Sequence, residues 1–515
     1  MTAASTGLAP APAERPPARA WPVIAALAFA GFAVSIVHTI VIPLMLSFPR
    51  LLNSSPATVS WLVTATLLTA AVSTPLFGRL GDQFGRRRML FAALTGLLAG
   101  SLVCALTSNA AVMIAGRALQ GTGIAALPLG MSIIGSVLPP ERRGAGIALL
   151  SSLLGAGGAV ALPISGVISQ HADFHLLFWL CAAVAVVAMA VVRIAVPSTP
   201  VQRGQRADAV GAVLLVLALL ALLVPLAQGR IWGWSSPLTL GLFAASVALL
   251  VLFTRVQLRR AAPLVDVRAT VRRPILLTNL ASVLMGFALY ASFLGTASFV
   301  EAPRAAGYGF GASLSTAALC LLPGGLLMLP LSPVTARISA RWGPKVALVS
   351  GALVVASGYL ARVVFTASLW QVVAGACVIS AGTGIAYASM PALIMDWTPA
   401  RDTSAANGLN ALARHVGTSL SSAAGSALLG SFTITVAGVT LPAERGYLLF
   451  FGIGGAAALA AATVAVFVPP TPGPSTATPG PDIARPSTDI ATAPQIARSL
   501  QLRRRRAGSA IAGGS

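Results

Sequence analysis

Residues 78–88 read Gly-Arg-Leu-Gly-Asp-Gln-Phe-Gly-Arg-Arg-Arg and separate two long apolar segments, 59–78 and 89–107. Each segment is close to the length of about 20 apolar residues that a helix needs to cross a bilayer. The chain is 56% hydrophobic, and its mean hydropathy is +0.86. These features predict that 78–88 is a charged loop at a membrane face and that the chain is an all-α polytopic membrane protein.

Apolar segments of this length recur along the chain. With Gly, Pro and charged residues taken as boundaries, we expect transmembrane helices at 21–46, 59–78, 89–107, 110–137, 144–169, 175–196, 209–227, 236–257, 275–298, 313–334, 346–364, 368–395, 405–433 and 446–468. An even number of spans, here fourteen, places both termini on the same side of the membrane.

Lys and Arg gather in alternate gaps between these segments. One set of gaps is rich in arginine, whereas the other set contains only Arg50, Arg230, Arg304, Arg362 and Arg445. Short loops rich in Lys and Arg stay cytoplasmic. The pattern therefore predicts a multi-pass protein of the cytoplasmic (cell) membrane with both termini in the cytoplasm.

The distribution of charge, the missing motifs and the cysteine spacing argue against several other classes of protein. The net charge of +22 is spread over many short loops instead of one face of a soluble domain, so we expect no nucleic-acid partner. The chain has no P-loop, GxGxxG or HExxH motif, which argues against an enzyme. The cysteines lie within expected spans without CxxC spacing, so no disulfide, metal or cofactor is predicted: Cys104, Cys181, Cys320 and Cys377.

An internal repeat organises the chain. Gly121-Thr122-Gly123-Ile124-Ala125 recurs as Gly382-Thr383-Gly384-Ile385-Ala386, and the basic turn at 79–87 recurs in part at 337–345. The near-constant spacing predicts two homologous six-helix halves around an inserted helical pair. The expected organisation is a disordered N-terminus (1–20), an N-terminal half (21–196), an insert with its linkers (197–274), a C-terminal half (275–468) and a disordered basic tail (469–515).

These motifs carry a family resemblance. The segment 78–88 resembles the loop signature of the major facilitator superfamily, and Arg117-Ala118-Leu119-Gln120-Gly121-Thr122-Gly123 resembles its fourth-helix motif. With fourteen spans, Thr39-Ile40-Val41 and Trp232-Gly233-Trp234, the chain is similar to the fourteen-helix drug:proton antiporter branch over about residues 20–470. The resemblance implies a monomeric, proton-linked exporter of small amphiphilic or hydrophobic compounds that works by alternating access.

The loop at 78–88 supplies the predicted gating residues. Gly78 and Gly85 allow tight turns and close helix approach. Asp82 is the only acid among Arg86, Arg87 and their basic neighbours, so it could cap a helix start or bridge to an arginine. The alternative is a charged turn that only fixes topology.

Basic and polar residues inside spans are the predicted transport and coupling residues. Arg117 lies well inside its span, where a charge normally faces a cavity or a partner, and Gln120 belongs to the same motif. Arg414 and His415 form a second polar island in the thirteenth span. If that span begins later than expected, Arg414 becomes a cytoplasmic anchor instead.

Small residues are predicted to allow close helix packing. They form the repeated pair of motifs and a Gly-rich fifth span: Gly121, Gly123, Gly382, Gly384, Gly158, Pro163 and Gly166.

The chain departs from the family pattern at its coupling acid. Family members usually carry an Asp two residues before the Thr39 motif, where this chain has Val37, and no acid lies in the middle of any expected span. Proton coupling is then absent or uses another group, for which Glu301 is the first candidate and His38 the second. Without a buried acid we expect neutral or anionic substrates. A uniporter or importer of a small metabolite, and a transporter-fold sensor without proton coupling, remain alternatives.

Overall fold

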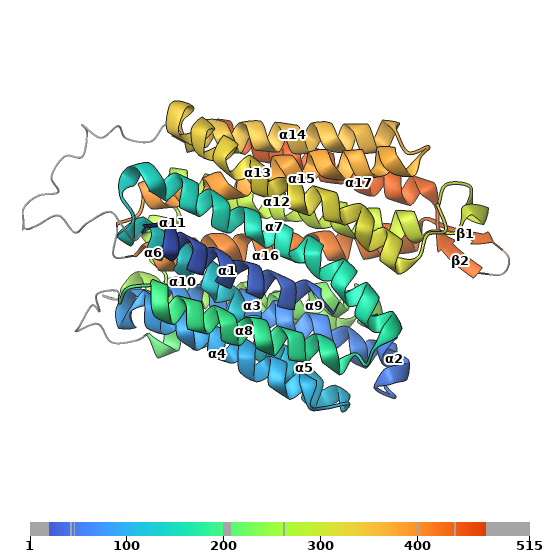
Figure 1. The fold of residues 1–515 in the computed structure, drawn as a ribbon, viewed down its shortest axis with the longest axis horizontal. Coiled ribbons are helices and arrows are strands. Elements are labelled where there is room, and N and C mark those ends of the chain that lie inside the picture. The colour runs from blue at the N-terminus through green and yellow to red at the C-terminus, as the bar shows by residue number, and fades with distance from the viewer. Residues whose placement is uncertain are drawn as a thin grey trace, which may run out of the picture. The chain divides into compact units, whose positions relative to one another are not determined.

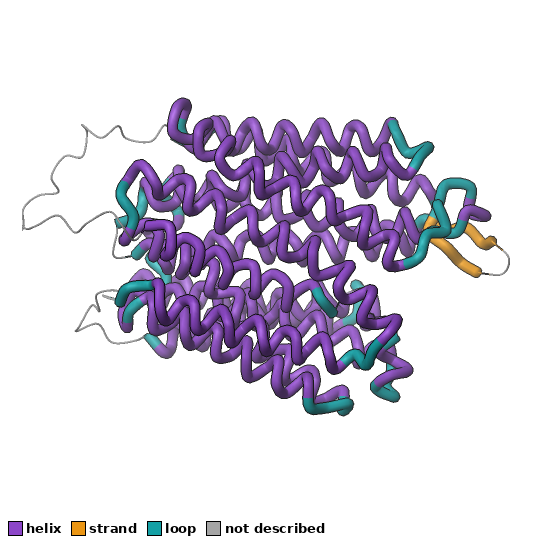
Figure 2. Tube along the Cα trace, viewed as in Figure 1, coloured by secondary structure: helices purple, strands orange, loops and turns teal. Residues whose placement is uncertain are grey.

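A computed structural model describes residues 20–41, 44–45, 47–198, 208–260, 263–399, 402–436 and 439–469 (Figure 1). Most of these residues lie in long helices, and one short pair of strands lies near the C-terminal end of the described chain (Figure 2). The expected tails, 1–20 and 469–515, fall almost entirely outside the described residues, so their predicted disorder stays a prediction.

The long helices follow the expected spans in order. They are α1 (Ala20–Thr39), α3 (Pro56–Phe84), α4 (Arg86–Ala105), α5 (Ala110–Gly121), α6 (Ala126–Val137), α7 (Pro140–His171), α8 (His175–Ala195), α9 (Ala209–Trp232), α10 (Pro237–Arg259), α12 (Arg273–Glu301), α13 (Leu314–Trp342), α14 (Pro344–Val364), α15 (Leu369–Asp396), α16 (Thr403–Ser431) and α17 (Glu444–Val466). The 3-10 helix η3 (Thr122–Ala125) joins α5 to α6.

In the described residues, thirteen helices are long and apolar enough to cross a membrane, with α5, η3 and α6 counted as one. The long helix α16 is not among them, because Asn, Ser, Thr and Arg side chains dilute its apolar residues. It packs against α12, α3 and α9 inside the bundle. An all-α multi-pass protein is confirmed, and the number of fourteen crossings stays a prediction.

The prediction of a loop at 78–88 is wrong. Helix α3 continues through Phe84, and α4 begins at Arg86, so only Gly85 separates them. Gly85 has φ +101°, a backbone conformation that residues other than Gly rarely adopt. Charged residues alone therefore did not mark the end of the helix; the glycine did.

Several short elements were not expected. The first span was drawn too long, since α1 ends at Thr39 and the four-residue helix α2 (Phe48–Leu51) follows. Helix α11 (Val267–Thr270) precedes α12, and β1 (Thr433–Val436) pairs antiparallel with β2 (Val439–Pro442) before α17. The thirteenth span was also drawn too long, because β1 begins where it was expected to end.

Buried side chains form separate apolar cores. One core joins α1 and α3–α8, and another joins α12–α17. Helix α9 packs on α10, α3 and α16 around a smaller core. The two sets of six helices meet where α7 contacts α13 and where α3 contacts α16 (Figure 1). The domain boundaries drawn from the repeat stay a prediction.

Candidate functional site

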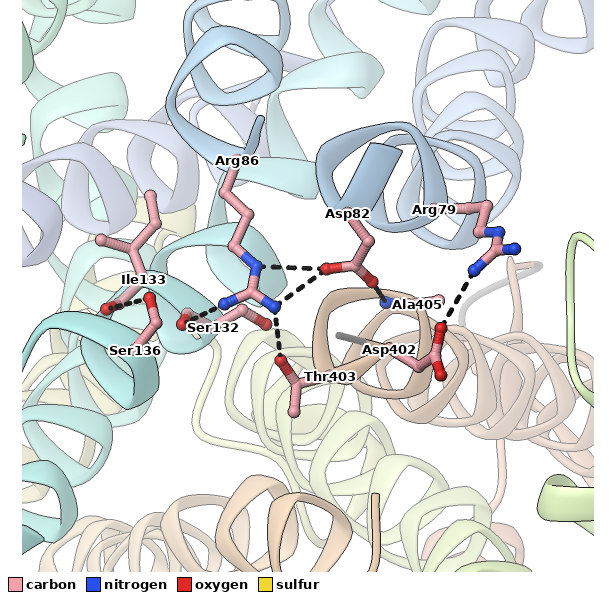
Figure 3. A network of polar contacts seen from close by, with 9 residues as sticks. All are labelled: Arg79, Asp82, Arg86, Ser132, Ile133, Ser136, Asp402, Thr403 and Ala405. Atoms are coloured by element: carbon pink, nitrogen blue, oxygen red, sulfur yellow. Dashed lines mark hydrogen bonds and ion pairs between the residues drawn. The ribbon is translucent and has the colours of Figure 1, made fainter. Parts of the chain in front are cut away.

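A buried ionic network links the end of α3 and the start of α4 to the start of α16 (Figure 3). Both Nε and one terminal nitrogen of Arg86 donate to the same Asp82 oxygen, at 3.1 and 3.0 Å. The second Asp82 oxygen accepts the backbone N–H of Ala405 at 3.0 Å. Asp82 is 4% exposed, so this carboxylate joins the two sets of helices away from water.

Further contacts extend this network. Arg86 donates to the hydroxyl of Thr403 at 2.9 Å and to the carbonyl of Ser132 at 3.1 Å. Arg79 donates to Asp402 at 3.1 Å. We call the group Arg79, Asp82, Arg86, Asp402, Thr403 and Ala405 the latch. A buried ion pair is stable only when extra hydrogen bonds satisfy its atoms, and the latch supplies them.

Local sequence explains the geometry of the latch. Asp82 and Arg86 are four residues apart, and the turn at Gly85 between them leaves their side chains close enough to pair at 3.0 Å. At Gly78, an added Cβ would lie 2.5 Å from the carbonyl oxygen of Ser404, so only Gly lets α3 touch α16 there. The first turn of α16 has backbone N–H groups without a preceding helical turn to bond to, and it carries the positive end of the helix dipole; both favour the Asp82 carboxylate, which accepts the N–H of Ala405.

The latch differs from the predicted gating set in two ways. Arg87 lies outside it, because it donates to the carbonyl of Arg193 at 2.8 Å and lies over Phe91. Asp402 and Thr403 belong to it but were not predicted. Their only sequence signal is their place directly after Pro399 and Arg401, which repeat the spacing of Pro140 and Arg142.

Arg117 is 1% exposed inside the first set of helices. It donates to the backbone carbonyls of Leu62 at 3.2 Å and Val37 at 3.1 Å, and to Gln120 at 2.5 Å. Gln120 in turn donates to the hydroxyl of Ser101 at 2.8 Å. The carbonyl of Val37 thus partners Arg117 at the position where the family resemblance predicts an Asp. Arg117 joins α1, α3 and α5.

His38 follows Val37 on α1. Its Nε2 is buried, and no hydrogen-bond partner for it is found among the described residues. Electrostatic interactions couple His38 to Arg117 and to His415 of α16. Two of the predicted coupling histidines, from opposite sets of helices, thus lie within the range of electrostatic interaction.

Arg414 lies in a polar cluster and is not a surface anchor, since it is only 8% exposed. It donates to Asn410 at 3.0 Å and lies 5.1 Å from the ring centroid of Tyr387. Asn410 donates to Asn279 at 3.0 Å and to Ser282 at 2.7 Å. Helices α12, α15 and α16 build this cluster.

Glu301 lies far from these groups. It is the last residue of α12 and is half-buried near Tyr447. The backbone of Arg414 packs against Gly286 of the same helix. The fifteen residues from Gly286 to Glu301 span about 22 Å of helix. The structure does not bring Glu301 to Arg414.

An arginine expected in an outer loop is buried instead. Arg362 of α14 is fully buried, donates to the hydroxyl of Thr296 at 2.7 Å and lies 4.3 Å from the ring centroid of Phe451. Like Arg117, it joins helices within its own set. Hydropathy did not reveal it, because it lies near the end of an apolar run.

The predicted packing residues lie where helices touch. A Cβ added at Gly121 would lie 2.5 Å from the carbonyl oxygen of Thr66, and one at Gly382 would lie 2.5 Å from that of Gly351. The others pack against side chains of neighbouring helices or, at Pro163, continue α7 without a break: Gly123, Gly158, Pro163, Gly166 and Gly384. In the described residues, no group of three His, Cys, Asp or Glu side chains could hold a metal.

Comparisons with known proteins agree with this architecture. The family model for the Major Facilitator Superfamily matches residues 27–361 and 276–512. The chain is 28% identical over 441 residues to the tetracenomycin C resistance and export protein of Streptomyces glaucescens, covering 85% of this chain and 80% of that protein. It is 27% identical over 340 residues to the lincomycin resistance protein LmrB of Bacillus subtilis, covering 65% of this chain and 69% of that protein.

Solved structures show the same fold. The human organic anion transporter MFSD10 matches with a TM-score of 0.62 at 15% identity, covering 88% of this chain and 100% of that chain. The proton:xylose symporter XylE matches with a TM-score of 0.62 at 14% identity, covering 88% of this chain and 97% of that chain. At these identities the likeness concerns the fold alone.

Proposed function

This chain belongs to the Major Facilitator Superfamily and is a multi-pass membrane transporter, and we propose that it exports small amphiphilic or hydrophobic compounds from the cytoplasm. The relatives named for tetracenomycin C export and lincomycin resistance support an efflux role. The arginine pattern supports a cytoplasmic membrane with both termini inside.

The latch is the observation that carries a gating mechanism. It joins the two sets of helices at the end of the bundle where α1 begins, which the arginine pattern assigns to the cytoplasm. Alternating access requires the two halves to separate at one membrane face and then at the other. In our proposal the latch is formed when the cytoplasmic side is closed, and it breaks when that side opens.

The buried charges support a preference for neutral or anionic substrates. Arg117 and Arg414 lie within the bundle, and no Asp or Glu contacts either of them among the described residues. In a region of low dielectric, an uncompensated cation repels other cations. The cluster around Arg414 is the better candidate for contact with substrate, since carbonyl groups already surround Arg117.

We propose that proton coupling uses His38. Its Nε2 has no hydrogen-bond partner among the described residues, and His38 interacts electrostatically with His415 across the two sets of helices, whereas Glu301 lies about 22 Å along α12 from the contact with Arg414. This placement reverses the order expected from sequence. Among the described residues no acid contacts His38, which also favours the uniporter as a second candidate.

The test is transport into everted membrane vesicles. Wild-type vesicles should take up tetracenomycin C or lincomycin when a proton gradient is imposed, and a permanent organic cation should be a poor substrate. Uptake that survives collapse of the gradient would point to a uniporter. Binding of either compound without any uptake would favour a sensor, and an absence of both would contradict the proposed function for these compounds.

Cysteine labelling tests the orientation of the chain in the membrane. A cysteine at position 84 should react with an impermeant maleimide only in permeabilised cells, because Phe84 is exposed beside the latch. A cysteine at position 173 or 304, both exposed at the opposite end, should react in intact cells. Labelling of position 84 from outside would overturn the orientation.

A further inference from the structure

The two sets of helices contain corresponding turns with different chemistry. Gly343 separates α13 from α14 with φ +87°, as Gly85 separates α3 from α4 with φ +101°. The pairs Arg79 with Arg337 and Gly85 with Gly343 are each 258 residues apart. At the same spacing, Ala340 stands where the first turn has the latch acid, and a proline stands where it has the latch arginine.

The first latch turn contacts the start of α16, and the corresponding start in the other set of helices, that of α7, has a different sequence. The motif at Pro140 and Arg142 recurs 259 residues later, so the first turn of α7 corresponds to that of α16. Gly144 then corresponds to Thr403, and Ala145 to Ser404. The start of α7 therefore has Gly and Ala at the two positions where the start of α16 has hydroxyl side chains.

A cavity occupies the place of the missing second latch. It has a volume of about 490 Å³ and lies between the turn at Gly343 and the start of α7. Its walls come from the corresponding small residues of both helices and from the end of α15: Ala336, Ala340, Pro344, Gly144, Ala145 and Met395. Cavities of roughly 300–1,000 Å³ are typical of sites for small molecules.

Besides Arg86 of the latch, two groups of opposite charge line this cavity, among small residues and hydroxyl side chains. Arg143 donates its Nε to the carbonyl of Leu138 at 2.8 Å, and both Arg143 and Asp396 face the cavity. Within the described part of the chain, neither forms an ion pair. An arginine offers donors in a fixed fork, and a carboxylate offers acceptors.

We propose that this cavity is a binding site at which an amphiphilic substrate first docks from the cytoplasm. The ligand class is a small molecule with an apolar body, an acceptor group for Arg143 and a donor group for Asp396. Arg86 and Thr403 of the latch also line the cavity, so a bound ligand lies against the latch itself. The inference rests on the proposed export function.

The first test fills the cavity. Ala340→Phe places a ring where Ala340 is exposed to the cavity, and Leu319→Phe is the matched control on an exposed face of the same helix. The probe is whichever of lincomycin and tetracenomycin C wild-type vesicles export, in radiolabelled form. Equilibrium binding to the purified protein should weaken at least about tenfold in Ala340→Phe and remain unchanged in Leu319→Phe.

The second test addresses the two charges without adding bulk. Arg143→Gln and Asp396→Asn should each weaken binding of the same probe about three- to tenfold, because each loses one charged hydrogen-bond partner. A cysteine at Ser339, which also lines the cavity, should react with N-ethylmaleimide, and the probe should slow that reaction. This labelling remains informative if the Phe variant fails to fold.

The outcomes separate this inference from the proposed function. Export by wild type, with unchanged probe binding in Ala340→Phe and no protection of the cysteine at 339, would overturn the cavity site and leave the exporter intact. No export of either compound by wild type would contradict the exporter first. Protection at 339 together with weakened binding in Ala340→Phe would support the site.

Discussion

The turn at Gly85 and the turn at Gly343 share a backbone but not a function. In both, a single glycine with positive φ separates two long helices. At the first turn, Asp82 and Arg86 form a buried network with α16, whereas at the second turn Ala340 and its neighbours line a cavity. The glycine sets the shape of the turn, and the charges decide whether the turn joins the two sets of helices.

This difference confines the buried ionic contact between the two sets of helices to the first turn, although helices pack together on both sides. Removal of one partner from a buried, hydrogen-bonded ion pair costs about 3–5 kcal/mol, because the other charge stays buried. A cavity lined by small residues offers no comparable resistance to separation. The cytoplasmic end should therefore open by breaking the latch, and variants at the two turns should behave differently.

The largest effect is expected for Asp82→Asn. The substitution keeps the size of the side chain but leaves Arg86 without its carboxylate, so the closed cytoplasmic side loses stability. Export of the probe should fall at least about tenfold, with little loss of protein from the membrane. Initial uptake rates in everted vesicles measure this effect. Full activity would leave Asp82 with only a topological role.

Gly85→Ala and Gly343→Ala form the next comparison. Each places a Cβ in a backbone conformation that residues other than Gly rarely adopt, which costs about 1–3 kcal/mol, so both variants should lose similar thermal stability. Only Gly85→Ala should also slow export strongly, because it shifts Arg86 relative to Asp82. Thermal unfolding and vesicle transport are measured on the same preparations. A larger export defect in Gly343→Ala would reverse the roles given to the two turns.

Asp402→Asn should have a smaller effect than Asp82→Asn. The Asp402 side chain is 31% exposed and pairs with Arg79 near the edge of the latch, where water screens the charge. Export should fall a few-fold at most, about 1 kcal/mol in barrier height. The ratio of the two export rates, Asp402→Asn to Asp82→Asn, checks this ranking; a ratio below one would contradict it.

The smallest effect is expected at the opposite end of the bundle. Asp173 accepts hydrogen bonds from the backbone N–H and side chain of His175, and these bonds lower the pKa of its carboxyl below the usual value. This contribution to stability is present above the carboxyl's unfolded-state pKa and is lost as pH falls through the folded value. Asp173→Asn should therefore lower the Tm slightly at pH 7, and the difference from wild type should be smaller at pH 3, below the unfolded-state pKa of the carboxyl. Equal differences at both pH values would exclude the carboxylate as their cause.

Sequence predicted the features that follow from local pattern. The apolar runs gave the order of the long helices, the mid-span position of Arg117 indicated that it is buried, and Asp82 stood out as the one acid in a basic segment. The ends of helices were less accurate, since α3 continues through its charged residues to Gly85. Length and polarity alone do not locate such an end.

Contacts between residues far apart in the chain could not be predicted from local sequence patterns. Asp82 bonds to Ala405, 323 positions away, and Arg362 is buried although it lies near the end of an apolar run. The cavity beside Ala340 forms because small residues of two helices face each other, and no local sequence pattern shows this. Such features depend on how helices pack and are found only when the fold is known.

A distance measurement between the two turns tests the central claim most directly. Phe84 and Trp342 occupy corresponding positions at the tips of α3 and α13, and both are exposed. Spin labels at these positions, in a background with Cys377→Ala, report the separation of the two sets of helices by pulsed electron paramagnetic resonance. Wild type should give mainly one short-distance population, and Asp82→Asn should add or enlarge a longer one. Identical distance distributions in the two proteins would contradict the latch.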